Sequence, residues 1–183
     1  MLVAALLGGL AAGFLLHGSL RNLEHFSLRL SWLVIVALAV QVVIFSPIGI
    51  WLPSQVIVTM HLTSYVLLLV CVASNLRRAP MIVFGTGVLC NTVAIAANGG
   101  YMPATRAALE FAGIPVSSQP HNNSLLADAG TRLGFLSDIF AVPRWAPLAN
   151  VFSVGDLLVA VGLAWLLAEG MRAGRQRAAA ALY

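Results

Sequence analysis

The residues best suited to chemistry in this chain are a few ionisable side chains within or beside long apolar segments. Asp156 lies near the start of the last apolar segment, and His61 lies near the start of the third, with Tyr65 one helical turn further along. Ionisable groups are costly to bury in a membrane, so they often mark proton, ion or ligand sites. Each of these residues is therefore a candidate for binding.

Asp156 also has a structural interpretation. Ser153 and Asp156 are spaced as Ser-x-x-acid, the pattern of a capping box, in which both side chains accept hydrogen bonds from free backbone N–H groups at a helix start. The carboxylate would also oppose the positive end of the helix dipole. The pattern favours a helix cap, and it leaves open a proton or cation site at the same residue.

Amide side chains could extend this group of polar residues. Asn91 and Asn98 are seven residues apart and share one face of the fourth apolar segment. Judged by depth, His61, Asn98 and Asp156 could form a water-accessible pocket together with Asp138 and His121 of the following loop. The candidate ligand-binding residues are His61, Tyr65, Asn91, Asn98, Asp138 and Asp156. The simpler interpretation, favoured without an observed contact, is that amides and hydroxyls link helices, at about 1 kcal/mol each.

The sequence gives no pattern for a cofactor. His17 and His61 lie near opposite ends of their segments, so one haem iron cannot reach both. Cys71 and Cys90 differ in depth by roughly 9 Å, at 1.5 Å per residue, and neither has a zinc-binding spacing. Phosphate-binding loops, dinucleotide fingerprints and nucleophile elbows are absent from the sequence. We therefore expect no haem, metal or other cofactor and assign no catalytic residue.

Long apolar segments must position the polar residues. The chain is 60% hydrophobic and 9% charged, with a mean hydropathy of +0.94, far from the composition of a soluble domain. A helix needs about 20 apolar residues to cross a bilayer. The expected membrane spans are about 2–18, 31–50, 55–75, 81–97 and 154–171. The predicted fold is all-α, one membrane domain over residues 1–183 with five transmembrane helices. The first segment lacks the charge and cleavage pattern of a removable signal peptide.

Arginines predict the orientation of these spans. The net charge of +4 comes from ten arginines and no lysine, placed at segment ends, which indicates topology signals and not nucleic-acid binding. Seven of the ten fall on one side if the N-terminus is outside: Arg21, Arg29, Arg77, Arg78, Arg172, Arg175 and Arg177. Positive charge is retained in short cytoplasmic loops. We therefore expect residues 172–183 to form a cytoplasmic tail.

Glycines and prolines predict where segments end and pack. Gly9 and Gly13 form a GxxxG pair, which permits close helix contact inside the bundle or with a partner protein. Gly99 and Gly100, after Asn98, predict the end of the fourth helix. Pro103 then predicts the start of a short helix.

The connection over residues 98–150 is too long for a plain loop, so we expect it to have structure of its own on the outer side. The predicted helix at Pro103 continues through Ala112 and ends at Gly113. Apolar residues at a helical spacing predict a second, amphipathic helix, namely Leu125, Ala129, Leu133, Leu136 and Phe140. This helix would lie on the membrane or cover the outer ends of the spans.

Three stretches resemble a family of small, uncharacterised bacterial multi-pass membrane proteins, a domain of unknown function. They are Asn98-Gly99-Gly100-Tyr101-Met102-Pro103, then Leu136-Ser137-Asp138-Ile139-Phe140 with Pro143, and Asn150-Val151-Phe152-Ser153-Val154-Gly155-Asp156. They cover the long loop and its two edges. The resemblance implies a protein of the bacterial cytoplasmic membrane, and it brings no activity or catalytic residue.

Three functional hypotheses follow. The scarcity of buried charge favours a non-enzymatic accessory or interaction subunit, which would engage the lipid bilayer and another membrane protein or a second copy of itself. The second hypothesis is a protein that binds or transports a small amphiphile, such as a lipid or quinone, under the loop. The third is an outer-face enzyme using His61, His121 and Asp138.

Overall fold

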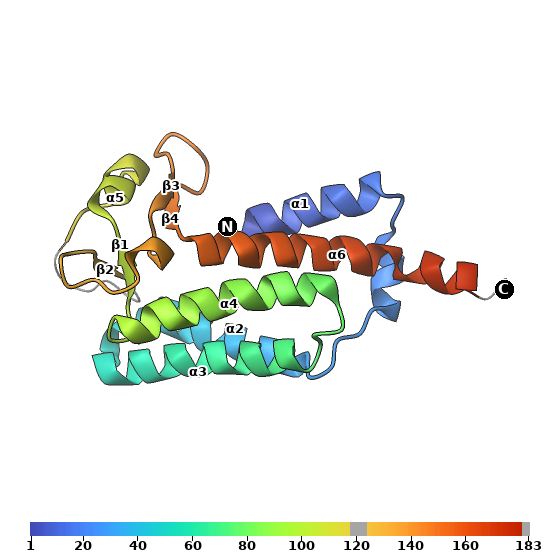
Figure 1. The fold of residues 1–183 in the computed structure, drawn as a ribbon, viewed down its shortest axis with the longest axis horizontal. Coiled ribbons are helices and arrows are strands. Elements are labelled where there is room, and N and C mark those ends of the chain that lie inside the picture. The colour runs from blue at the N-terminus through green and yellow to red at the C-terminus, as the bar shows by residue number, and fades with distance from the viewer. Residues whose placement is uncertain (118–123, 181–183) are drawn as a thin grey trace.

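The computed structural model describes residues 1–117 and 124–180. Helices dominate it and run along one long axis, with an irregular cap at one end (Figure 1). The long helices are α1 (Leu2–Leu15), α2 (Trp32–Phe45), α3 (Ser54–Ala73), α4 (Ala79–Ala97) and α6 (Val154–Ala180). Helix α6 packs between α1 and α4, and α3 packs between α4 and α2. The all-α prediction is therefore confirmed only in part, because the structure is mostly helical but also contains two small sheets.

Three of these helices are long and apolar enough to cross a membrane. They are Ser54–Ala73, Ala79–Ala97 and the Val154–Ala173 part of α6. Helices α1 and α2 are apolar but have 14 residues each, about 21 Å at 1.5 Å per residue, which is short of a ~30 Å hydrocarbon layer. Both are shorter than predicted from the sequence.

Local backbone geometry explains the two early ends. Helix α1 stops because His17 takes the left-handed conformation, with φ of 58°. Helix α2 stops at Pro47, since proline has no N–H to continue the helix, and the 3-10 helix η2 (Pro47–Trp51) follows it. A second 3-10 helix, η1 (Leu20–His25), packs against α6. The predicted end of α4 is confirmed, since Gly99 and Gly100 both have positive φ.

The GxxxG pair of α1 faces α6. A Cβ atom on Gly9 would lie 2.8 Å from the carbonyl oxygen of Ala164, and one on Gly13 would clash with Met171. Gly9 and Gly13 are both buried. This close contact is therefore made within the chain.

The end of the bundle opposite the cap is held by side chains of the α3–α4 connection. The Asn75 carboxamide accepts a hydrogen bond from the Arg29 backbone N–H (2.9 Å) and donates one to the Arg29 carbonyl (2.8 Å). Arg78 pairs with Glu169 of α6 and lies over the ring of Phe26, 4.5 Å from its centroid. Arginines thus gather at this end of the bundle.

In its described parts, the cap (residues 98–117 and 124–150) contains one short α-helix, a 3-10 turn and two strand pairs, the last of which ends at Phe152. Helix α5 (Arg106–Ala112) is capped by Thr105 and ends at Gly113 in the left-handed conformation. The predicted start at Pro103 is wrong, because Pro103 lies in strand β1 (Met102–Ala104), which pairs in parallel with β2 (Ser124–Leu126). Strands β3 (Phe140–Val142) and β4 (Asn150–Phe152) pair antiparallel.

The amphipathic helix predicted for the segment from Leu125 to Phe140 is also wrong. After β2, the Asp128 carboxylate accepts a hydrogen bond from the Gly130 N–H (2.8 Å), which forms a local turn. Leu133 then has a φ of 54°, which a helix does not allow, and only the single 3-10 turn η3 (Gly134–Leu136) follows. Of the five apolar residues, Leu136 packs against Ala94 and Ile95 of α4, while Phe140 stacks on Phe152 of β4.

Candidate functional site

The site begins with the start of α6, where the predicted capping box forms. The Ser153 hydroxyl accepts a hydrogen bond from the Asp156 N–H (3.0 Å), and Asp156 Oδ2 accepts one from the Ser153 N–H (2.9 Å). Ser153 is fully buried. Asp156 is therefore a helix cap, and its carboxylate is fixed in place.

Asn91 of α4 extends the cap into a contact between helices. Its amide nitrogen donates to Asp156 Oδ1 (2.8 Å), and its Oδ1 lies 3.0 Å from the Ser153 hydroxyl. Asn91 is 3% exposed, and Gly155 leaves room for it, since a Cβ there would overlap the amide oxygen. Both oxygens of the Asp156 carboxylate thus accept hydrogen bonds from the protein.

Asp138 is the second carboxylate of the site, and the strand β1 holds its backbone. The Asp138 N–H donates to the Pro103 carbonyl (2.8 Å), and the Asp138 carbonyl accepts from the Thr105 N–H (3.1 Å). The residue is 9% exposed, and its Oδ1 has no hydrogen-bond partner within residues 1–117 and 124–180. Burial, and secondly the charge of Asp156, raise the Asp138 pKa to about 7.

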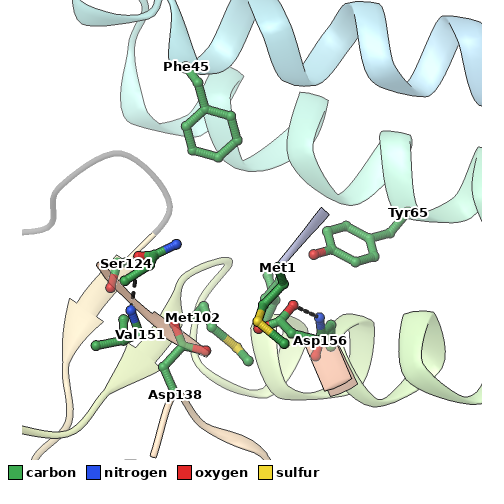
Figure 2. Close-up of a pocket in the computed structure, with 11 residues that line it drawn as sticks. Met1, Phe45, Tyr65, Met102, Ser124, Asp138, Val151 and Asp156 are labelled. Carbon is green, nitrogen blue, oxygen red and sulfur yellow. Dashed lines mark hydrogen bonds between the residues drawn. The ribbon is translucent and has the colours of Figure 1, made fainter. Parts of the chain in front are cut away.

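The two carboxylates line one cavity of about 390 Å³ between the cap and the helices (Figure 2). The polar residues that line it are Tyr65, Asn91, Ser124, Asp138, Asn150 and Asp156. Apolar side chains complete it, with Phe45, Ile95 and Met102 among them. Among the described residues, no arginine or histidine lines this cavity.

Tyr65 and His61 lie on successive turns of α3. The Tyr65 hydroxyl points into the cavity toward Asp156 and Met1 (Figure 2). His61 is 2% exposed and packs edge-on against Tyr65, with 5.1 Å between the ring centroids, and its ring also contacts Phe45. Within the described part of the chain neither ring nitrogen of His61 has a hydrogen-bond partner, and His61 does not line the cavity.

Asn98 has a different role from the one its depth suggested. Its side-chain oxygen accepts from the Arg132 N–H (2.9 Å), and its nitrogen donates to the Arg132 and Ala94 carbonyls (2.9 and 2.8 Å). These bonds attach the cap to the end of α4 and use the whole amide. Asn98 is not among the residues lining the cavity.

The structure thus brings together four of the six residues proposed from the sequence, namely Tyr65, Asn91, Asp138 and Asp156. Sequence reasoning missed Phe45, Met102, Ser124 and Asn150 as lining residues. His121 lies outside the described residues. Over residues 1–117 and 124–180, no three His, Cys, Asp or Glu side chains are grouped to hold a metal ion, and Cys71 and Cys90 are free.

Comparison with protein families found one match. The model described as "Family of unknown function (DUF5317)" matches residues 25–168, which is most of the chain and includes all three motif stretches. Helix α1 lies outside the matched region. The comparison with curated proteins found no match, and neither did the comparison with solved structures.

Proposed function

The chain belongs to the DUF5317 family, whose function is unknown, and we propose that it is a membrane protein that binds a small amphiphile in the cavity under its cap. The observation behind this proposal is the cavity of about 390 Å³ that Asp138 and Asp156 both line. Small-molecule pockets usually measure about 300–1,000 Å³ and combine apolar walls with a few polar groups. The cavity has this size and this mixture.

The polar groups of the cavity favour ligand binding over the simpler interpretation that they only link helices. Buried polar atoms in native proteins nearly always have a hydrogen-bond partner, and exceptions require an explanation. The Asp138 carboxylate is such an exception among the described residues, and it lines the cavity. A ligand that supplies the missing partner would account for both the space and the unpaired oxygen.

We further propose that the protein lies in the bacterial cytoplasmic membrane with five spans and an external cap. Helices α1 and α2 run beside the three long apolar helices (Figure 1), and the 3-10 helix η2 follows α2 after the extended Ser46. The arginines Arg29, Arg77 and Arg78 lie at the end opposite the cap, as retention of positive charge in the cytoplasm requires.

This orientation can be tested by cysteine labelling in spheroplasts with a membrane-impermeant maleimide. Trp145→Cys, on the exposed surface of the cap, should react in intact spheroplasts. Arg77→Cys, at the opposite end, should react only after permeabilisation. The reverse pattern would place the cap in the cytoplasm and contradict the proposed external pocket.

An accessory or interaction subunit remains a second candidate function, because the cap exposes large apolar side chains. Trp145 is 83% exposed, Leu148 68% and Phe135 67%. Such a surface suits a partner protein or the bilayer interface. The GxxxG pair is already in contact with α6, so it does not itself offer a surface to a partner. Co-purification of a partner that Trp145→Ser abolishes would favour this candidate.

Filling the cavity tests the proposed binding function directly. Val151→Trp places a large side chain at the cavity wall, and Val142→Trp makes the same change in the adjacent strand, where Val142 does not line the cavity. Native mass spectrometry of protein extracted in mild detergent should show a bound small molecule in the wild type and in Val142→Trp, and none in Val151→Trp. Equal spectra for all three proteins would contradict the proposal.

A further inference from the structure

We infer, on the basis of the proposed binding function, that the cavity takes a small organic cation, a protonated or quaternary amine, with Asp138 as its counter-ion. Below about pH 7 a proton occupies the Asp138 carboxyl of the ligand-free protein. The cation enters, the Asp138 O–H bond breaks, and one proton leaves to solvent as the ammonium–carboxylate pair forms. Binding is thus an exchange of one positive charge for another.

The charge of the cavity selects for a cation. Two carboxylates line it, and none of the described arginines of the cap does. Arg106 is paired with Glu110 at 3.7 Å, and the side chain of Arg144 lies beside Gly113. Met1 also lines the cavity and carries the α-amino group of the chain, so the two ionised carboxylates outnumber a single positive charge, which disfavours an anionic ligand.

The two carboxylates differ in how many of their oxygens already accept a hydrogen bond. Both oxygens of Asp156 are occupied by Asn91 and Ser153, so Asp156 contributes a fixed negative charge. Asp138 has an oxygen without a partner in the described chain, at 9% exposure. A carboxylate in this state is stable only when it is protonated or when a cation lies beside it. Asp138 is therefore the group that a ligand changes.

The remaining walls fit an organic cation better than a bare metal ion. The rings of Phe45 and Tyr65 line the cavity, and aromatic faces attract ammonium groups. Ile95 and Met102 offer apolar surface for the carbon skeleton of the ligand. Among the described residues there is no group of three acidic, histidine or cysteine side chains for a metal, and the space is far larger than one ion needs.

The proton exchange makes binding dependent on pH. The titratable groups that share the cavity with Asp138 are Asp156 of α6, Tyr65 of α3 and the α-amino group of Met1 at the start of α1. Helix α4 contributes only the neutral Asn91, and the strands contribute only neutral residues. The Asp138 pKa of about 7 sets the pH below which the affinity for a cation should fall. A cation that binds only the ionised carboxyl should lose about tenfold in affinity for each pH unit below 7 and show a constant affinity above it.

The test uses three probes of one shape with different charges: 2-phenylethylammonium, 2-phenylethanol and 3-phenylpropionate. Binding is measured by isothermal titration calorimetry on the full chain in dodecylmaltoside micelles, which carry no ammonium group, from about pH 5.5 to 8.5. The wild type should bind the ammonium probe best. Asp138→Asn should bind it at least tenfold more weakly at pH 8 and without pH dependence, while Asp128→Asn, which changes an exposed carboxylate of the cap, should behave as the wild type.

Two outcomes would overturn the inference. If 2-phenylethanol binds as tightly as the ammonium probe at every pH, the ligand is not selected as a cation, and the proposed binding function still stands. If no probe binds and Val151→Trp also matches the wild type by native mass spectrometry, the proposed binding function fails as well. Should Asp138→Asn not fold, titrations of the wild type at pH 6 in two buffers of different ionisation enthalpy decide, since the inference requires release of about one proton per cation.

Discussion

The bond between Asn91 and Asp156 allows the sharpest test of how the site is built. Asn91→Ala leaves Asp156 Oδ1 without its donor, and Asp156→Ala leaves a buried amide without its acceptor. Hydrogen bonds to a charged group contribute about 1.5–3 kcal/mol, and polar links between membrane helices contribute less, up to about 1.7 kcal/mol. The Asp156 change also removes a helix cap, worth about 1 kcal/mol.

From these contributions we expect the free energy of unfolding to fall by about 1–2 kcal/mol for Asn91→Ala and by about 2–3 kcal/mol for Asp156→Ala. The double variant should lose about 1 kcal/mol less than the sum, because both single changes break the same bond. The quantity is measured by reversible unfolding in mixed micelles. Thr92→Ala is the matched control, since its hydroxyl bonds only to the Val88 carbonyl of its own helix.

A coupling energy below about 0.3 kcal/mol would refute this reasoning, because it is within the error expected for independent sites. It would mean that α4 and the start of α6 are not joined through this bond. The cavity wall would then depend on the cap alone.

Three further predictions concern the cap and the helix packing. Asn98→Ala removes the amide that holds the Arg132 backbone, so backbone amides near Arg132 should exchange hydrogen about tenfold faster, measured by mass spectrometry, while those of α3 stay unchanged. Gly9→Val should destabilise the fold by about 1–3 kcal/mol in unfolding measurements, because its Cβ meets the α6 backbone, whereas Gly8→Val, which faces open space, should have little effect. Burial raises the Asp138 pKa from 3.8 to about 7, so between these pH values the ligand-free fold binds a proton that the unfolded chain releases. Unfolding titrations should therefore show the free energy of unfolding falling from about pH 4 to 7 and staying constant above pH 7. Asp138→Asn should remove this slope.

Much of the helical frame is readable from the sequence, because local signals determine it. Gly99 and Gly100 end α4 through positive φ, and the Ser-x-x-acid spacing forms the reciprocal cap at Ser153 and Asp156. In each case the signal and the structure involve residues within one turn of each other. Helix lengths were less readable, since the turn at His17 has no strong sequence signal.

The cap could not be predicted because distant partners determine it. The strand Ser124–Leu126 pairs with Met102–Ala104, more than 20 residues away, and only this pairing makes it a strand. The spacing from Leu125 to Phe140 fits a helix equally well, yet Leu133 adopts a conformation that its residue type does not suggest. Periodicity alone therefore gave the wrong element.

Depth along a helix predicted which polar residues lie at the same end, and it did not predict where their side chains point. Asn91 and Asn98 share a face and differ in role, because Asn91 meets the cap of α6 while Asn98 meets the backbone of the loop above it. His61 lies at the right depth, yet it packs against the rings of Tyr65 and Phe45 and does not line the cavity. Side-chain direction depends on the neighbouring helices, whose arrangement the sequence does not show.

The two carboxylates illustrate how one structural feature can create the chemistry of another. Asp156 accepts hydrogen bonds from Asn91 and Ser153 at both oxygens, and this fixes a negative charge at the cavity wall. That charge adds to the effect of burial on Asp138 and raises its affinity for a proton. The helix cap is thus part of the reason why Asp138 can exchange a proton near neutral pH. A site with Asp138 alone, or with Asp156 lacking its partners, would bind a proton or a cation at Asp138 less tightly.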